Sequence, residues 1–317
     1  MKKILVTGAL GQIGTELVMK MRDMYGANNV IASSRSKRKE TEVTESGPFE
    51  LVDVVNAQQI ADAVKKHNVD TVVNLAAILS ASGEANPSGT WDINMGGLYN
   101  ILEVARENNC AVCTPSSIAV FGPSTPKEQT PQDTVMRPTT MYGVTKVAGE
   151  LLCDYYHMKF NVDTRGMRYP GLISNKALPG GGTTDYAVHI YYEALKHKKY
   201  ECFLDKGTRM DMMYMPDALN AVIQLMEADP AKLIHRNAFN VTAMSFDPEG
   251  IAAEIRKHIP EFELTYNVNQ DIQKIANSWP DSLDDSQARK QWNWNPKYDL
   301  ASMTEDMLTE LKKKLNI

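Results

Sequence analysis

Cysteine and histidine are sparse in this chain, and neither is arranged as a metal site. Only four of the 317 residues are cysteines and six are histidines. Cys110 and Cys113 have the Cys-x-x-Cys spacing of redox motifs, but Cys113 falls in a short apolar run typical of a strand. No second cysteine pair completes a zinc site, and no two histidines are spaced as His-x-x-x-His. We therefore expect neither a bound metal nor a redox cysteine pair.

Excess positive charge and long apolar segments are also missing. The formal net charge is -5, whereas a nucleic-acid-binding surface should be basic, so no nucleic-acid partner is expected. No apolar run approaches the ~20 residues that span a bilayer. The apolar start of the chain is interrupted by Thr7 and Gly8, which favours a first strand over a signal peptide. We expect a cytoplasmic protein without a membrane partner.

Alternating strands and helices dominate the first half of the chain. Short apolar runs alternate with segments whose apolar residues recur at helical spacing, such as Ile13, Leu17 and Met21. We predict strands at residues 3–7, 30–32, 49–53, 71–75 and 111–115, and one helix over about 91–107. Strands that alternate with helices build a parallel sheet covered on both faces. The predicted fold class is α/β, with a doubly wound parallel (Rossmann) sheet.

The second half of the chain predicts a smaller lobe. After residue 171 the alternation weakens, and the Pro-Gly-Gly-Gly stretch at 179–182 is a loop with unusual backbone freedom. Residues 217–226 and 238–241 have the pattern of a return to the first lobe. We predict two domains: a dinucleotide-binding Rossmann domain, 1–171 and 212–242, and a C-terminal α/β substrate-binding lobe, 172–211 and 243–317.

A glycine-rich loop follows the first predicted strand. Gly8, Gly11 and Gly14 are spaced as Gly-x-x-Gly-x-x-Gly at the start of a helix. Glycines allow a tight turn and a close approach to a pyrophosphate, and the helix N-terminus supplies amide donors. The pattern predicts a nicotinamide dinucleotide cofactor. Ligands of such sheets bind outside the carboxyl ends of the strands, which adds further residues to the predicted cofactor site: Gln12, Ile13, Asp53, Val54, Leu75, Ala76 and Ala77.

The second strand ends without the acidic residue that usually binds the ribose hydroxyls of NAD. Ser34 and Arg35 stand there, followed by a basic run that ends at Lys39. Ser34 can hydrogen-bond a ribose hydroxyl, whereas Arg35 could pair with the 2′-phosphate of NADP. The basic run could equally be a solvated loop. We predict NAD as the cofactor, with NADP as the alternative.

Tyr142 and Lys146 have a Tyr-x-x-x-Lys spacing. On a helix the two side chains lie one turn apart on one face, roughly 5–6 Å between β-carbons. An ammonium at this distance favours the ionised phenolate, which can take a proton from an alcohol. The spacing also arises by chance on helix surfaces. Here, however, Ser117 precedes the tyrosine at a strand end and the glycine loop predicts a nicotinamide cofactor.

Taken together, these residues show that the chain resembles the extended short-chain dehydrogenase/reductase superfamily over nearly its whole length. The resemblance rests on the glycine loop, Asp53, the Asn-Leu-Ala-Ala string at 74–77, Asn94, Ser117 with Val-Phe-Gly at 120–122, and the Tyr–Lys pair. It implies that Tyr142 is the catalytic base, that Lys146 assists it and holds the nicotinamide ribose, and that Ser117 orients the substrate oxygen. It also implies that Asn94 and Tyr169 contribute to the cofactor site.

Longer strings resemble the short-chain type of L-threonine 3-dehydrogenase within that superfamily. They occupy residues 78–84, 168–171, 182–186, 212–218 and 279–284. The resemblance implies an NAD-dependent oxidation of the L-threonine side-chain alcohol to 2-amino-3-oxobutanoate, in threonine catabolism. It also implies that Ser80, Thr183 and Thr184 hold the amino-acid carboxylate or amine. Alternatively, Ser80 could cap a loop and Thr183 could begin a helix. Ser34 departs from the pattern, where an Asp is usual.

Two other functions are compatible with the sequence. Nucleotide-sugar epimerases and dehydratases share the framework, but they need groups for a substrate diphosphate, and residues 172–210 contain one arginine, Arg209. A non-catalytic NAD(P)-sensing module would keep the glycine loop, yet all three catalytic residues are present here. The resemblance further implies a homodimer through the helices around 91–107 and 142–160. Their apolar residues, such as Leu151 and Leu152, could equally belong to the core.

Overall fold

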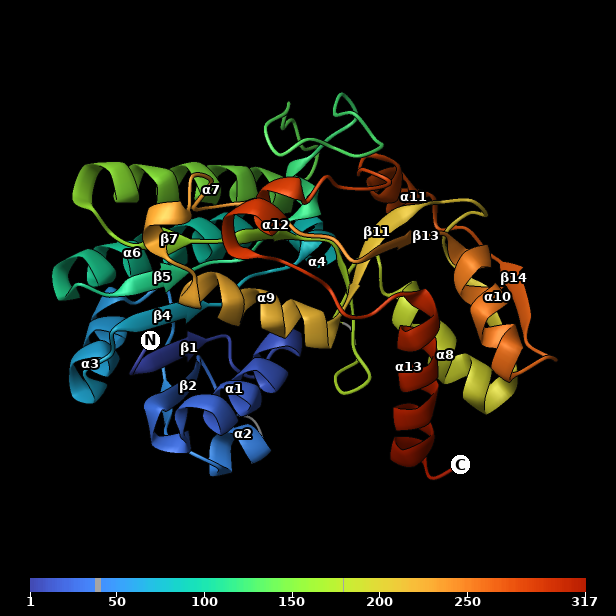
Figure 1. The fold of residues 1–317 in the computed structure, drawn as a ribbon, viewed down its shortest axis with the longest axis horizontal. Coiled ribbons are helices and arrows are strands. Elements are labelled where there is room, and N and C mark those ends of the chain that lie inside the picture. Colours follow the sequence, from blue (N-terminus) through green and yellow to red (C-terminus); the bar gives the residue numbers. More distant parts are fainter. Residues whose placement is uncertain (38–40, 179) are drawn as a thin grey trace.

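The fold is a central parallel sheet with helices on both faces. A computed structural model describes residues 1–37, 41–178 and 180–317 (Figure 1), so Arg38 and Lys39 of the basic run and Pro179 of the glycine-rich loop lie outside the described residues. Six strands pair in parallel in the order β3-β2-β1-β4-β5-β7. The predicted Rossmann sheet is therefore confirmed. Its strands are β1 (Ile4–Thr7), β2 (Val30–Ser34), β3 (Phe49–Leu51), β4 (Thr71–Asn74), β5 (Ala111–Cys113) and β7 (Thr164–Arg165).

Two apolar layers attach helices to the two faces of this sheet. One layer joins it to α3 (Ala57–His67), α6 (Gly97–Asn108) and α7 (Met141–Phe160), and the other joins it to α1 (Gln12–Tyr25), α9 (Met215–Glu227) and α12 (Ser286–Trp292). Figure 1 shows α6 and α7 on the opposite side of the sheet from α1 and α9. Strand β1 is buried along its whole length, as expected when helices cover both faces of a parallel sheet.

The helix predicted over residues 91–107 is interrupted. Helix α5 (Pro87–Trp91) and α6 are joined by a π-helical segment, Asp92–Gly96. Such segments are rare and often occur at functional sites. Asn94 on this segment accepts a hydrogen bond from the Ile78 amide at 2.8 Å and donates one to the Ile78 carbonyl at 3.1 Å. The π-helical segment therefore supports the loop that follows β4.

A third apolar core holds the smaller lobe, drawn at the right of Figure 1. It packs together α8 (Tyr186–His197), α10 (Pro248–His258), α11 (Gln270–Asn277), α13 (Leu300–Leu315) and the parallel strands β10 (Lys199–Cys202) and β14 (Glu263–Tyr266). Two further three-stranded sheets are formed by strands between residues 116 and 246. They are β9 (Gly171–Ile173) with β11 (Met210–Tyr214) and β13 (Met244–Phe246), and β6 (Ser116–Ser117) with β8 (Met167–Tyr169) and β12 (Phe239–Asn240).

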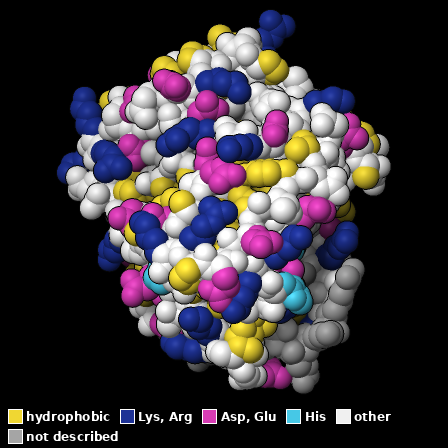
Figure 2. Space-filling model, turned by 90° about the vertical axis from the view of Figure 1, so that its right-hand side faces the viewer, with side chains coloured by type: hydrophobic (Ala, Val, Ile, Leu, Met, Phe, Trp, Pro, Cys, Tyr) yellow, Lys and Arg dark blue, Asp and Glu magenta, His cyan; other side chains and the backbone are white. Residues whose placement is uncertain are grey.

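Charged side chains of both signs are mixed over the outer face of the smaller lobe. Figure 2 shows lysines and arginines interspersed with aspartates and glutamates on this face, with apolar side chains between them. Such mixing gives neither sign a continuous patch on the side shown. Within the described ranges, no helix has both the length and the apolar character needed to cross a membrane.

Candidate active site

A cleft follows the carboxyl ends of the parallel strands, and it has two halves that share Leu75, Ala76 and Ala77. The half that we name the dinucleotide half is lined by residues that include Gly8, Gly11, Ser34, Arg35, Asp53 and Val54. The half that we name the catalytic half is lined by residues that include Gln12, Ile13, Ser80, Asn94, Ser117, Tyr142, Lys146, Tyr169, Thr183 and Thr184. Of the site residues predicted from the sequence, Gly14 alone lines neither half.

Two glycines of the glycine loop, Gly8 and Gly14, are packed too tightly for side chains. Gly8 has a φ of +66°, and a Cβ there would lie 2.7 Å from the carbonyl carbon of Leu75. A Cβ at Gly14 would lie only 2.4 Å from the Gly8 carbonyl oxygen. Gly14 therefore supports the loop from behind rather than facing the cleft. This backbone packing leaves the start of α1 open toward the cleft.

The first turn of α1 provides free hydrogen-bond donors. No side chain caps this helix at Gly11, so the amides of its first turn lack partners within the helix. Gln12 Nε2 is also buried without a partner among the residues that the structure describes. Such a terminus favours an anionic group. The loop and the open donors thus fit the pyrophosphate of a nicotinamide dinucleotide.

The far end of the dinucleotide half lacks a carboxylate at the end of β2. Ser34, Arg35, Ser36 and Thr41 line this end, and Asp53 is the one acidic side chain among the described lining residues. Asp53 Oδ1 accepts a hydrogen bond from the amide of residue 55 at 3.2 Å, which fixes the turn after β3. The hydroxyls can bind ribose, and the guanidinium can bind a phosphate.

Helix α7 carries the tyrosine–lysine pair at its start. Thr140 caps the helix by accepting a hydrogen bond from the Gly143 amide at 3.0 Å. Tyr142 is 9% exposed, and Lys146 Nζ lies 5.5 Å from the centroid of its ring. The same ammonium donates to the Pro115 carbonyl at 2.8 Å. The predicted helical pairing of the two side chains is therefore present in the structure.

Ser117 lies beside this pair but not at the end of β5, where the sequence indicated a strand end. It belongs to the separate strand β6, which pairs with β8. Its Oγ accepts a hydrogen bond from the Ala119 amide at 3.2 Å. A Cβ at Gly143 would lie 2.3 Å from the Ala119 carbonyl oxygen, so α7 packs closely on the turn after Ser117. A hydroxyl, a phenol and an ammonium thus share one wall, an arrangement that can orient an alcohol and remove its proton.

Asn94 and Tyr169 line the catalytic half but use their polar atoms within the protein. Besides its two bonds to the backbone of Ile78, Asn94 donates to Thr145 Oγ1 at 3.1 Å. The Tyr169 hydroxyl donates to the Ala218 carbonyl, and burial raises the pKa of this phenol well above its ordinary value. Both side chains therefore shape the wall of the cleft.

The smaller lobe contributes a polar segment ahead of α8. Thr183 is 1% exposed, and its Oγ1 is buried with no hydrogen-bond partner in the described part of the chain. Helix α8 begins at Tyr186, with Asp185 at the N-cap position, so Thr183 does not begin it. Asp185 accepts bonds from the Gly181 and Gly182 amides at 3.0 and 2.8 Å, which lower its pKa, but burial dominates and raises it. Ser80 and Thr184 line the same half.

Comparison with known proteins identifies the family of this chain. Residues 4–241 match the family model described as the NAD dependent epimerase/dehydratase family. The chain belongs to this family. The predicted resemblance to extended short-chain dehydrogenases/reductases is thereby confirmed, and the family implies a nicotinamide cofactor, NAD(P).

Several members of the epimerase/dehydratase family are similar along their full length. An uncharacterised epimerase/dehydratase of Staphylococcus haemolyticus is 56% identical over 99% of both chains. The solved L-threonine dehydrogenase of Clostridium difficile is 60% identical, covering 99% of this chain and 98% of that one, with a TM-score of 0.98. That of Phytophthora infestans is 51% identical over 98% and 99%, with a TM-score of 0.95.

The catalytic half is also lined by residues to which the sequence analysis gave no role. Among them are Thr114, Ser116, Glu150 and Trp279. Glu150 follows Lys146 by one helical turn, so the helical period could have indicated it. Trp279 reaches the cleft from a segment more than 130 residues after Tyr142, and no local pattern predicts such a contact.

The cysteines of this family member lie in apolar surroundings. All four are free and buried. Burial raises the pKa of Cys110 to about 11 and that of Cys113 to about 12. Thiols in such surroundings remain protonated and unreactive near neutral pH.

Proposed function

We propose that this protein is an NAD-dependent L-threonine 3-dehydrogenase that acts in threonine catabolism in the cytoplasm. The observation that carries the proposal is the convergence of Ser117, Tyr142 and Lys146 with the unpartnered buried hydroxyl of Thr183 in one half of the cleft. The full-length similarity to L-threonine dehydrogenases supports it. The proposal includes the roles of the individual residues and the division into two domains at 1–171 with 212–242 and 172–211 with 243–317.

The reaction removes a proton and a hydride from the side-chain alcohol of L-threonine. Tyr142, as phenolate, takes the hydroxyl proton, and a positioned base of this kind contributes ~10²–10⁴-fold. Lys146 stabilises the phenolate and holds the nicotinamide ribose, while Ser117 hydrogen-bonds the reacting oxygen. The C–H bond at the same carbon breaks as the C=O bond forms, and bound NAD⁺ supplies the hydride acceptor. The product is 2-amino-3-oxobutanoate.

The substrate end of the cleft suits a small zwitterion. Ser80, Thr183 and Thr184 are the proposed contacts of the carboxylate or amine. Arg209, the one arginine between residues 172 and 210, is turned to Ser245, bonding its Oγ at 3.0 Å and its carbonyl at 2.8 Å. The Arg209 guanidinium is therefore already hydrogen-bonded to Ser245. A substrate diphosphate would need such a group as its partner, so this arrangement disfavours a nucleotide-diphosphate substrate.

A substrate screen tests the proposed activity. We expect L-threonine to drive NAD reduction, followed as absorbance of NADH, while UDP- and GDP-sugars give no turnover. Epimerisation of a nucleotide sugar, with no reduction of NAD by hydroxy amino acids, would replace the proposal with the epimerase alternative. Cofactor binding without turnover of any of these compounds would instead indicate a sensing module.

Replacement of Tyr142 tests the catalytic base. Tyr142→Phe removes the proton acceptor but keeps the ring, so we expect kcat to fall ~10²–10⁴-fold with the NAD dissociation constant unchanged. Tyr298→Phe is the control, because Tyr298 is partly exposed, lines neither half of the cleft and lies outside the proposed dimer surface. A Tyr142→Phe variant as active as the control would show that another group is the base.

The preference between NAD and NADP is open to a direct titration. We propose NAD as the cofactor, with Ser34 hydrogen-bonded to its ribose. The ribose hydroxyls of NAD need hydrogen-bond partners, and these do not have to be charged. Arg35 gives the alternative, because a guanidinium can bind the 2′-phosphate. If the protein bound NADP more tightly than NAD, and if Arg35→Ala removed this difference, NADP would be the cofactor.

We also propose a homodimer through α6 and α7. These helices expose a set of large apolar side chains: Tyr99 at 51%, Leu151 at 59%, Tyr155 at 48% and Met158 at 77%. A second copy would cover this surface. Light scattering should give twice the chain mass of 35.3 kDa, reduced to the chain mass in a Leu151→Glu variant. A wild-type mass of one chain would contradict this part of the proposal.

A further inference from the structure

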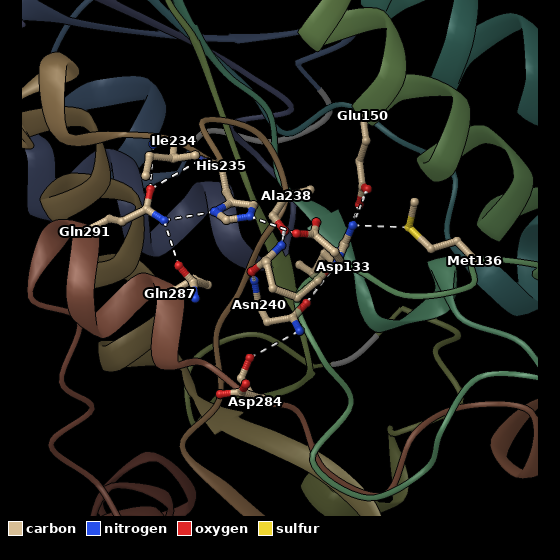
Figure 3. Close-up of polar contacts among 12 residues, drawn as sticks. Asp133, Met136, Glu150, Ile234, His235, Ala238, Asn240, Asp284, Gln287 and Gln291 are labelled. Carbon is tan, nitrogen blue, oxygen red and sulfur yellow. Dashed lines mark hydrogen bonds and ion pairs between the residues drawn. The ribbon is translucent and has the colours of Figure 1, made fainter.

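A buried ion pair borders the catalytic half of the cleft, which Glu150 and its partner Ser116 help to line. Arg168 on β8 and Glu150 on α7 are each 6% exposed, and Arg168 Nε and Nη2 contact the two carboxylate oxygens at 3.0 and 2.9 Å. Ser116 Oγ donates to Glu150 Oε1 at 2.5 Å. Figure 3 shows Glu150 reaching from its helix into a set of polar contacts that extends to Asn240 and Asp284. The pair is thus part of a connected network rather than an isolated contact.

This network joins the two elements that carry the catalytic residues. Ser116 directly precedes Ser117 in β6. Glu150 follows Lys146 by one helical turn and Tyr142 by two, and residues four apart lie on one face of a helix. A shift of Ser116 against Glu150 is therefore also a shift of Ser117 against Tyr142.

Arg168 is fixed from several sides. Its Nη1 donates to the Gln132 carbonyl at 2.8 Å and to Asn240 Oδ1 at 3.1 Å, and its guanidinium carbon lies 5.2 Å from the centroid of the Phe121 ring. The parallel register of β6 and β8 also places Ser116 opposite Arg168. The carboxylate of Glu150 therefore meets a partner that has little freedom to move.

Stability alone is a weak reason for two charges in this place. Well-packed apolar residues often replace a buried ion pair without loss, because desolvation offsets the attraction. Directional bonds supply a fixed geometry, and a misplacement of about 1 Å can cost ~10²-fold in rate. Resting on the proposed function, we propose that Ser116, Glu150 and Arg168 are positioning residues. They hold Ser117 in register with Tyr142 during oxidation of the alcohol.

A second buried serine–glutamate pair provides a matched control. Ser174 Oγ donates to Glu16 Oε1, also at 2.5 Å, and both residues are buried. Neither lines the cleft among its described lining residues. Ser116→Ala and Ser174→Ala each remove one buried hydroxyl donor from such a pair, and Ser174→Ala also removes the acceptor of the Lys176 and Ala177 amides. Both variants should therefore lower Tm by a few degrees, Ser174→Ala by at least as much as Ser116→Ala.

The kinetic effects should differ. For Ser116→Ala we expect kcat to fall ~10–100-fold, with the NAD dissociation constant unchanged, because the serine acts on geometry and not on cofactor binding. Ser116→Thr keeps the hydroxyl and should recover most of this loss. Ser174→Ala should keep kcat within about twofold of wild type. An equal kcat in Ser116→Ala and Ser174→Ala would overturn the proposal, because a merely structural bond would affect both alike.

A crystallographic comparison gives a readout that needs no substrate. In Ser116→Ala we expect Ser117 Oγ to shift relative to the Tyr142 hydroxyl by ~0.5 Å or more, the tolerance of a working site. An unchanged separation would also overturn the proposal. If the wild-type enzyme does not oxidise L-threonine, the proposed function fails, whereas these two crystal structures still decide whether the network positions Ser117.

Discussion

The two halves of the cleft differ in which atoms form their walls. The dinucleotide half is shaped by backbone atoms in close contact, where Gly8 and Gly14 leave no room for a Cβ. The catalytic half is shaped by side chains from distant segments, with Ser117 on β6, Tyr142 on α7 and Thr183 ahead of α8. The lining of the first half comes from residues between 8 and 93, whereas that of the second comes from residues between 12 and 279.

This difference has opposite consequences for substitution. Where backbone segments touch, an added methyl group must force them apart, and the cost appears in folding as well as in binding. Where a side-chain hydroxyl has no partner in the protein and is free to bind a ligand, its removal weakens ligand binding alone, because no hydrogen bond within the protein is lost. Added atoms should therefore damage the dinucleotide half, and removed polar atoms should damage the catalytic half.

An added methyl group at Gly14 should have the largest effect of the three changes considered in this comparison. The new Cβ would lie 2.4 Å from the Gly8 carbonyl oxygen and 2.7 Å from Ala9 Cα, and both are backbone atoms. We expect Gly14→Ala to lower the free energy of unfolding by about 1–3 kcal/mol, measured by urea denaturation. Because the loop must open, NAD binding should weaken at least ~10-fold in a fluorescence titration.

Two other glycines separate packing from cofactor contact. A Cβ at Gly11 meets the Gly8 carbonyl oxygen at 3.2 Å and nothing closer, so Gly11→Ala should fold well yet still hinder the pyrophosphate. Gly96 has a helical backbone and nothing within 4 Å of a Cβ, so Gly96→Ala should keep both properties. If Gly14→Ala and Gly96→Ala bound NAD equally, the glycine loop would not be the pyrophosphate site.

The same contrast explains what the sequence could predict. The main sheet and the dinucleotide half depend on local patterns, namely apolar runs, helical spacing and glycine spacing, and the predicted parallel sheet is present. The pairing of Tyr142 with Lys146 is also local, because both lie on one helix. The roles assigned to the glycine loop and to this pair remain predictions that the proposed experiments test.

Contacts between residues far apart in the sequence could not be predicted from local sequence patterns. The separate strand β6 exists because Ser116 and Ser117 pair with β8, some fifty residues later. The π-helical segment places Asn94 against the backbone of Ile78, a contact that a regular helical period does not indicate. The bond between Glu150 and Arg168 likewise depends on how α7 meets β8. Each of these features is decided by tertiary packing rather than by propensity.

Removal of the Thr183 hydroxyl should have an intermediate effect, confined to substrate binding. Its Oγ1 is buried and unpartnered among the described residues, so Thr183→Val breaks no bond that the structure shows. We expect KM for L-threonine to rise ~10-fold, the worth of one good hydrogen bond. The free energy of unfolding should stay the same or increase, because an unsatisfied polar atom is no longer buried.

Thr114 is the matched control for this prediction. Its Oγ1 is also buried without a partner in the described part of the chain, and it also lines the catalytic half, but no substrate contact is proposed for it. Thr114→Val should therefore have the same free energy of unfolding as Thr183→Val. Its KM for L-threonine should be that of the wild type. A KM for L-threonine that is unchanged in Thr183→Val would remove this residue from the substrate site.

The junction between the two lobes should show the smallest effect, visible as a dependence on pH. Glu16 on α1 accepts the hydrogen bond of Ser174, which follows β9. Burial raises the pKa of this carboxyl above its ordinary value of 4.5, and the Ser174 bond with nearby Lys176 and Lys314 only partly offsets that rise. The folded protein therefore binds this proton more tightly than the unfolded chain does. Stability must then fall as the pH rises from about 4.5 through the raised pKa.

Glu16→Gln isolates this contribution, because the amide keeps an oxygen for Ser174 and cannot ionise. Below about pH 4.5 the variant and wild type should have the same Tm. Above it the variant should become more stable by a few degrees, since it avoids the cost of a buried charge. Exposed Glu45→Gln is the control and should leave the pH dependence of Tm unchanged. If Glu16→Gln followed the wild-type curve across this range, the Glu16 carboxyl would not be a source of the pH dependence of stability.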